Sequence, residues 1–371
     1  MDKNFIIYIP GSELTQIHER TPWLMIPIAF KELGYNSTII CGKYSLKSRY
    51  DIDIYTTMPR STSFLKSAFE PILAFRRIFS LKPDIVLISP FGSYLFSIIP
   101  LTLTYKLYAV LARQRKTKFI MKTDWSLEFT DSKRWKKLFS ILLLSISSHT
   151  FDKISLETYC GLNKANSIPL IKKQNLTRVP VGFPENMDYD KIFNCRHYTN
   201  RIICVARVTP MKGQIVLLKA FLLLSTKYPK WQLRFVGPIE DVEYKNQLDS
   251  LILKGKIEDK VSFSGFIEEN LLLKELGKAS IFCLPSIYKE SAGNVKYEAL
   301  AAGLPVVTTD VPCKEDNEEL GFLVSKAGDI NALAKNLELL ISDPLLRTKL
   351  VKNFRGKILS YKNLAELYIS L

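Results

Sequence analysis

The sequence predicts an α/β protein built from two Rossmann-like domains, and three observations support this fold class. Apolar runs of strand length alternate with longer helical runs through the first half of the chain. This alternation stops between Val179 and Asn200 and restarts at Ile202. A chain of 371 residues with 47% hydrophobic and 24% charged residues can also bury two cores, as soluble two-domain proteins do.

The first half contains the elements of one doubly wound sheet. Strands are expected at Phe5–Ile9, Ser37–Cys41, Ile85–Ser89 and Lys118–Lys122, with a helix at Thr21–Leu33. The apolar window Phe91–Tyr105 is interrupted by Pro100 and is too short to span a bilayer, so it predicts a buried helix. Because the chain starts directly with a strand, we expect no signal peptide and a cytoplasmic location. The six cysteines show no CxxC spacing and are expected to be reduced core residues.

Two strand ends in this half carry candidate site residues. Gly11 and Ser12 follow the first strand, where open parallel sheets bind ligands, although Gly11 could simply permit a turn. Asp124 ends another strand and could hydrogen-bond a substrate hydroxyl or cap a turn.

Positive charge is concentrated in the first half. Residues 1–180 hold 26 Lys and Arg against 13 Asp and Glu (+13), and residues 181–371 hold 26 against 23 (+3). The density is highest where Lys133, Arg134, Lys136 and Lys137 surround Trp135 before an apolar run. This is the pattern of a basic amphipathic helix at an anionic surface. A core helix with a solvated face would also fit it.

The second half begins with a strand and a basic loop. Ile202–Ala206 leads into Arg207 and then Lys212-Gly213, and the apolar helix Ile215–Leu224 follows. A basic, Gly-bearing loop at a helix start is suited to holding a diphosphate. Two surface cations beside a turn are the simpler alternative.

Residues Ile281–Val307 form a strand, a loop, a helix and the start of another strand. Glu290 lies in the loop and Glu298 in the helix, and Gly293-Asn294-Val295 leads into the first helical turn. The free N–H groups of that turn favour an anion, while carboxylates can accept hydrogen bonds from hydroxyls. A phosphate flanked by hydroxyls describes a nucleotide sugar.

The string Glu290-SAGNVKY-Glu298-ALAAGLPVV resembles the signature of retaining GT-B glycosyltransferases of family 4, the glycosyl transferases group 1 type. Ser291-Ala292-Gly293 replaces the family's usual Phe-Gly pair. The resemblance implies that Glu290 contacts the transferred sugar and Glu298 the ribose. Arg207 and Lys212-Gly213 then hold the departing diphosphate, and the strand ends at Gly237 and at Phe266-Ile267 line the base.

Other roles also follow from the resemblance. Gly11 and Ser12 correspond to a loop that faces the acceptor or the diphosphate. Asp124 stands where related enzymes commonly carry His, and none of the three histidines lies at that strand end. No DxD-type pair is placed to bind a metal, so we expect no metal and no cofactor.

The sequence therefore predicts a GT-B enzyme whose two domains face each other across a cleft. Residues 1–185 form the acceptor-side domain, 186–199 the linker, 200–350 the donor domain, and 351–371 a C-terminal helix returning to the first domain. We expect sugar transfer to a glycan or lipid-linked acceptor at the inner membrane face.

The alternatives are an epimerase or phosphorylase of the same fold, or a non-catalytic basic protein binding membranes or nucleic acid. A nucleic-acid binder would need aromatic residues among the basic ones, and only Trp135 fits, so no nucleic-acid partner is expected. Donor, acceptor, linkage and oligomeric state cannot be read from the sequence.

Overall fold

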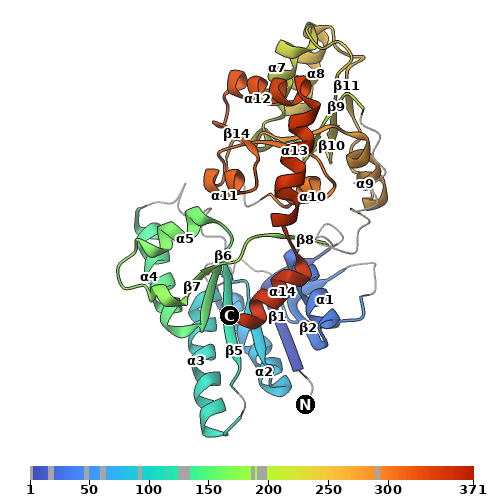
Figure 1. Ribbon diagram of the computed structural model, residues 1–371. Coiled ribbons are helices and arrows are strands. Elements are labelled where there is room, and N and C mark those ends of the chain that lie inside the picture. Colours follow the sequence, from blue (N-terminus) through green and yellow to red (C-terminus); the bar gives the residue numbers. More distant parts are fainter. Residues whose placement is uncertain are drawn as a thin grey trace. The chain divides into compact units, whose positions relative to one another are not determined.

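The chain folds into two compact units in a computed structural model (Figure 1). One unit contains Met1–Pro184 with Leu359–Leu371, and the other contains Glu185–Ile358. The structure describes residues 3–15, 21–45, 50–58, 64–90, 94–114, 116–123, 134–184, 189, 199–288 and 293–371, with the backbone alone at 64–68, 134–137 and 269–270.

The first unit is built on a parallel sheet of seven strands in the order β3-β2-β1-β4-β5-β6-β7. The strands are β1 (Lys3–Leu14), β2 (Tyr35–Tyr44), β3 (Asp53–Thr56), β4 (Ile85–Ile88), β5 (Lys118–Thr123), β6 (Lys153–Leu156) and β7 (Leu176–Arg178). The strand order reverses beside β1, which pairs with β2 on one side and β4 on the other. The expected alternation is confirmed, and β3, β6 and β7 are additional strands.

Helices cover both faces of this sheet because side chains of successive strand residues point to opposite sides. On one face, Phe5 and Ile7 of β1 pack with α1 (Pro22–Glu32) and α14 (Tyr361–Ser370). On the other, Ile6 and Tyr8 pack in a core shared with α2 (Phe64–Leu81), α3 (Leu95–Leu111), α4 (Arg134–Thr150) and α5 (Tyr159–Asn166). The first unit is therefore a doubly wound domain with two cores.

The expectation that Phe91–Tyr105 forms a buried helix is wrong in one respect. Helix α3 does cover this window from Leu95, and Ile98 and Tyr105 are buried in the core. Its opposite face is exposed, however, with Leu103 and Leu107 among the large apolar side chains in solvent. No described helix is long and apolar enough to cross a membrane.

The end of the chain belongs to the first unit from Leu359 onward, later than the expected start at 351. Before the last helix, the short strand β15 (Leu359–Ser360) pairs with β8 (Gly182–Phe183). Helix α14 then packs beside α1 (Figure 1). Its Tyr368 hydroxyl lies 3.3 Å from the Ser155 hydroxyl in the core.

The second unit has a parallel sheet of six strands in the order β11-β10-β9-β12-β13-β14. The strands are β9 (Arg201–Val205), β10 (Gln232–Val236), β11 (Val261–Phe263), β12 (Ile281–Leu284), β13 (Val306–Thr309) and β14 (Leu323–Ser325). The connecting helices are α7 (Gln214–Ser225), α8 (Val242–Gly255), α9 (Glu269–Lys278), α10 (Asn294–Ala301), α11 (Lys314–Glu319), α12 (Ile330–Ser342) and α13 (Pro344–Phe354). Two Rossmann-like domains are thus confirmed.

Candidate functional site

The sheet of the second unit reverses its strand order at β9, which lies between β10 and β12. In open α/β sheets, ligands bind outside the carboxyl ends of the strands at such a reversal. The residues that follow β9 and β12 are therefore the first place to look for a site. They include Arg207, Lys212 and Gly213 on one side and the start of α10 on the other.

The loop after β9 is fixed against the segment after β12. Gly213 has φ of 69°, and a Cβ built on it would lie 2.1 Å from the carbonyl oxygen of Pro285. Nearby, the amide of Ile287 donates to the carbonyl of Met211 at 2.9 Å. Only glycine permits this approach of the two backbones. The loop that carries Lys212 is thus held at the strand-order reversal.

Arg207 lies at the exposed rim of this loop. Its Nη1 is 2.8 Å from Oε2 of Glu240, and both side chains are about half exposed, 51% and 42%. An exposed ion pair of this kind contributes little to stability. The guanidinium can therefore exchange Glu240 for an anionic ligand at small cost.

Lys212 is half-buried in the loop that follows β9. Burial raises the pKa of the Cys204 thiol to about 12, and the positive charge of Lys212 opposes that rise. The ammonium charge is thus close to the carboxyl end of the central strand. Arg207 and Lys212 together place two cations at the strand-order reversal.

The start of α7 is less free than the sequence suggested. The Tyr244 hydroxyl accepts the amide of Ile215 at 2.9 Å, and the Gln214 side chain donates to the carbonyl of Arg207 at 2.8 Å. Burial raises the pKa of Tyr244 to about 12, so the hydroxyl stays neutral. Sequence reasoning missed both residues. The groups of this loop best placed to bind an anion are therefore the side chains of Arg207 and Lys212. The amides at the start of α7 are less available.

Helix α10 offers the second anion-binding feature. It starts after Gly293, whose φ is 72°, and no described side chain caps its first turn. Asn294 and Val295 of this turn are half-buried, while Glu298 is buried further along the helix. Glu290 lies outside the described residues, so the structure does not place it relative to Glu298.

The ends of β10 and β11 close the same edge of the sheet. Gly237 donates its amide to the carbonyl of Gly265 at 2.9 Å, and a Cβ on Gly237 would lie 2.1 Å from the Ala206 carbonyl oxygen. Phe266 is largely exposed and Ile267 half-buried beside this contact. The structure thus brings all the described donor-site candidates to one edge of one sheet.

In the first unit, Gly11 and Ser12 lie inside β1 rather than in a loop after it. Strand β1 continues to Leu14 through an irregularity between Ile9 and Glu13. Glu70 of α2 is buried beneath it and accepts hydrogen bonds from the Tyr8 hydroxyl, the Thr57 hydroxyl and the Gly11 amide. A buried acid therefore supports the ends of β1 and β3. Sequence reasoning did not identify Glu70.

The other first-unit candidates are not placed by the structure. Asp124 and Lys133 lie outside the described residues. Arg134, Trp135, Lys136 and Lys137 form the first turn of α4, but their side chains are not described.

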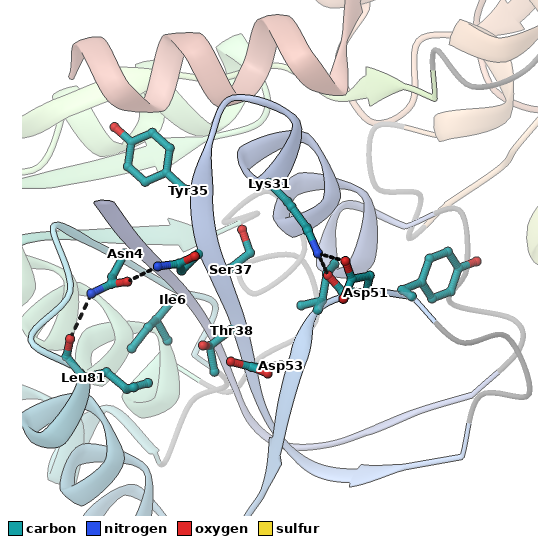
Figure 2. Close-up of a pocket in the computed structure, with 12 residues that line it drawn as sticks. Asn4, Ile6, Lys31, Tyr35, Ser37, Thr38, Asp51, Asp53 and Leu81 are labelled. Atoms are coloured by element: carbon teal, nitrogen blue, oxygen red, sulfur yellow. Dashed lines mark hydrogen bonds and ion pairs between the residues drawn. The ribbon is translucent and has the colours of Figure 1, made fainter. Parts of the chain in front are cut away.

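A pocket of about 350 Å³ lies at the opposite edge of the first sheet (Figure 2). Asn4, Ser37 and Asp53 line it from the amino ends of β1, β2 and β3. Its polar groups bond to one another, for instance Asn36 to Asn4 at 3.2 Å and Lys31 to Asp51. Because ligands of parallel sheets bind at the carboxyl edge, we assign no function to this pocket.

Comparison with known proteins finds a family match over the second unit. Residues 188–357 match the family described as glycosyl transferases group 1, the type that the sequence from Glu290 to Val307 resembles. An uncharacterised glycosyltransferase of Haemophilus influenzae is 36% identical over 149 residues, 39% of this chain and 40% of that protein. The phosphatidyl-myo-inositol mannosyltransferase of Mycobacterium leprae is 32% identical over 145 residues, 38% and 37% of the two chains. The chain thus spans about two fifths of the length of these relatives.

The fold comparison covers both units. The crystal structure of Anabaena HepE with UDP and glucose superimposes with a TM-score of 0.67 at 14% identity, covering 98% of each chain. At this identity the likeness shows the fold alone, and that fold is GT-B.

Proposed function

We propose that this chain, which has the GT-B fold and matches glycosyl transferases group 1 over residues 188–357, transfers a sugar from a nucleotide-sugar donor to an acceptor hydroxyl. One observation carries the proposal: Arg207, Lys212 and the start of α10 follow β9 and β12, the two strands that meet at the strand-order reversal of the second sheet. Two cations and the amides of a helix start suit a diphosphate.

In this proposal, each group acts on a different part of the donor. Arg207 and Lys212 neutralise the charge that builds on the diphosphate as the sugar bond breaks. Glu298 accepts hydrogen bonds from the ribose hydroxyls, and Glu290 contacts the sugar. Because these cations supply the positive charge, the reaction proceeds without a metal ion and without a cofactor. Asp124 contacts the donor sugar or the incoming hydroxyl.

The stereochemical course and the acceptor are further parts of the proposal. The resemblance around Glu290 favours retention at the anomeric carbon. The Mycobacterium leprae relative is named for mannosyl transfer to phosphatidyl-myo-inositol, and HepE was crystallised with UDP and glucose. We therefore propose a glycan or lipid-linked acceptor at the inner face of the cell membrane.

Calorimetry with a panel of UDP-, GDP- and ADP-sugars in EDTA tests the donor assignment. We expect one donor to bind in EDTA, and Arg207→Gln with Lys212→Gln to weaken that binding by about tenfold or more, as losing charge-assisted hydrogen bonds requires. Lys254→Gln, an exposed cation on α8, is the matched control and should bind normally.

Each alternative has its own outcome in this experiment. Binding only with magnesium or manganese would refute the metal-free mechanism. Binding of no donor in either condition would refute the glycosyltransferase. Conversion of the bound donor into its epimer, without transfer, would identify an epimerase.

A further inference from the structure

Helix α3 exposes a continuous apolar face. Leu103, Leu107, Val110 and Leu111 are 50% to 75% exposed, and their spacing of three, four and seven residues puts them on one side of the helix. The one charged residue of α3, Lys106, turns away from this side. Its ammonium lies 2.9 Å from Oδ2 of Asp152 and donates to the Thr150 carbonyl at 2.9 Å.

Helix α4 extends the same kind of surface. Leu138, Leu142 and Ile146 are exposed at helical spacing, whereas Leu143 and Leu144 face the core. The two helices are in contact, since the ring centroids of Phe96 on α3 and Phe139 on α4 lie 5.1 Å apart. We call the seven exposed residues Leu103, Leu107, Val110, Leu111, Leu138, Leu142 and Ile146 the α3–α4 face.

The size of this face sets it apart from ordinary surface. Single exposed apolar residues are normal in soluble proteins, but contiguous large apolar patches mark interaction sites. Both helices already bury their inner sides against the sheet. The α3–α4 face therefore has no role in the core of the first unit.

The charges around the face select its partner. The sequence has no Asp or Glu from Ile85 to Thr123, and none from 132 to 151. Arg113 and Lys116, directly after α3, are exposed. In a symmetric dimer the same patch of both copies would meet, so the basic residues beside one face would repel those beside the other. An anionic bilayer surface complements both the apolar and the basic groups.

We propose that the α3–α4 face docks the protein on an anionic phospholipid bilayer, with its leucines at the boundary of headgroups and acyl chains. Arg113 and Lys116, exposed directly after α3, would contact lipid phosphates. This bilayer-docking surface goes beyond the proposed function. It rests on the proposed sugar transfer only for the reason why the protein would dock on a membrane. Binding to vesicles requires no sugar transfer, so the two proposals fail independently.

Cosedimentation of the full chain with vesicles tests the docking surface. We expect binding to vesicles of phosphatidylglycerol and phosphatidylcholine at physiological salt, and much weaker binding to phosphatidylcholine alone. The triple variant Leu103→Gln, Leu107→Gln and Leu111→Gln should lose about tenfold or more in affinity, because three apolar side chains no longer leave water. The matched control replaces Leu223, Leu253 and Leu345, which are 59%, 61% and 81% exposed in the second unit. It should bind like the wild type.

A second variant separates charge from apolar contact. Arg113→Gln with Lys116→Gln should weaken binding to the anionic vesicles and reduce its salt dependence. Circular dichroism and the melting temperature check that each variant folds. A wild type that never binds the anionic vesicles, or a leucine variant that binds them normally, would overturn the proposal. A wild-type dimer in sedimentation velocity that the leucine variant abolishes would assign the face to a second copy instead.

Discussion

The ammonium of Lys296 donates to Oδ1 of Asn317 at 2.7 Å, and the lysine side chain is only 1% exposed. Asn317 in turn donates to the carbonyl of Thr309 at 3.0 Å, so this contact links α10 to the end of β13 and to α11. A Cβ on Gly293 would lie 3.0 Å from Cε of Lys296. The lysine stem therefore lies directly beneath the turn that starts α10.

Replacing Lys296 by Met keeps the apolar stem and removes the charge. Because a hydrogen bond to a charged group contributes about 1.5–3 kcal/mol, Lys296→Met should lower the free energy of unfolding by roughly that amount. Urea unfolding measures it, and Lys219→Met, at an exposed position of α7, is the control. If Lys296→Met is as stable as the wild type, the hydrogen bond that links α10 to α11 does not contribute to the free energy of unfolding.

Gly213 should tolerate alanine poorly. In Gly213→Ala the new methyl carbon would lie 2.1 Å from the Pro285 carbonyl oxygen, in addition to the cost of a positive φ of about 1–2 kcal/mol. We expect a loss of stability above that cost, together with weaker nucleotide-sugar binding as the cationic loop moves.

Gly328 provides the matched control for this substitution. Its φ is 82°, yet a Cβ there would meet nothing within 4 Å. Gly328→Ala therefore measures the cost of the positive φ alone, without a steric clash. Equal destabilisation in the two alanine variants, measured by urea unfolding, would show that the contact with Pro285 is not tight.

Glu70 should make stability depend on pH in an unusual direction. Burial raises the pKa of this carboxyl, although hydrogen bonds from Thr57, Tyr8 and Gly11 oppose the rise. A carboxyl whose pKa is higher in the folded protein stabilises it fully below the unfolded pKa, and this contribution is lost as pH rises through the folded pKa. The stability advantage of the wild type over Glu70→Gln should therefore shrink as pH rises from acid to neutral.

Glu338 offers the opposite control. The Lys227 side chain lowers the pKa of this exposed carboxyl through a hydrogen bond, so its contribution is present above the unfolded pKa and lost as pH falls. Urea unfolding across a pH series gives the free energy of unfolding of the wild type, Glu70→Gln and Glu338→Gln. A wild-type advantage over Glu70→Gln that grows with pH would contradict the assignment.

The sequence was informative where a site is encoded by one continuous segment. Arg207, Lys212 and Gly213 follow one strand within seven residues, and the Glu290–Val307 string contains its own strand, turn and helix. Their placement at one sheet edge then follows from the parallel order of the strands. The two-domain architecture was predictable for the same reason, since strand and helix periods alternate locally.

The missed residues depend on tertiary contacts between distant segments. Tyr244 reaches the start of α7 from the next helix, and Glu70 lies 62 residues from Tyr8. The exposed side of α3 was misjudged because that helix is apolar all round, and periodicity cannot tell which side the sheet leaves uncovered. Lys296 is a further case, since its partner Asn317 lies 21 residues along the chain.

Glu298 and Glu290 are proposed to contact different parts of the donor, the ribose and the transferred sugar. Glu298 is buried on α10, where its carboxylate would accept hydrogen bonds from the ribose hydroxyls. At about 1.5–3 kcal/mol for a hydrogen bond to a charged group, Glu298→Gln should raise KM for the donor by roughly tenfold or more. Glu290→Gln should mainly lower kcat, because its proposed contact is with the sugar that reacts. Steady-state kinetics with the donor identified by calorimetry, with Glu243→Gln on the exposed side of α8 as control, distinguishes these effects. Full activity in both variants would remove the two acids from the donor site and leave Arg207, Lys212 and the start of α10 as its support.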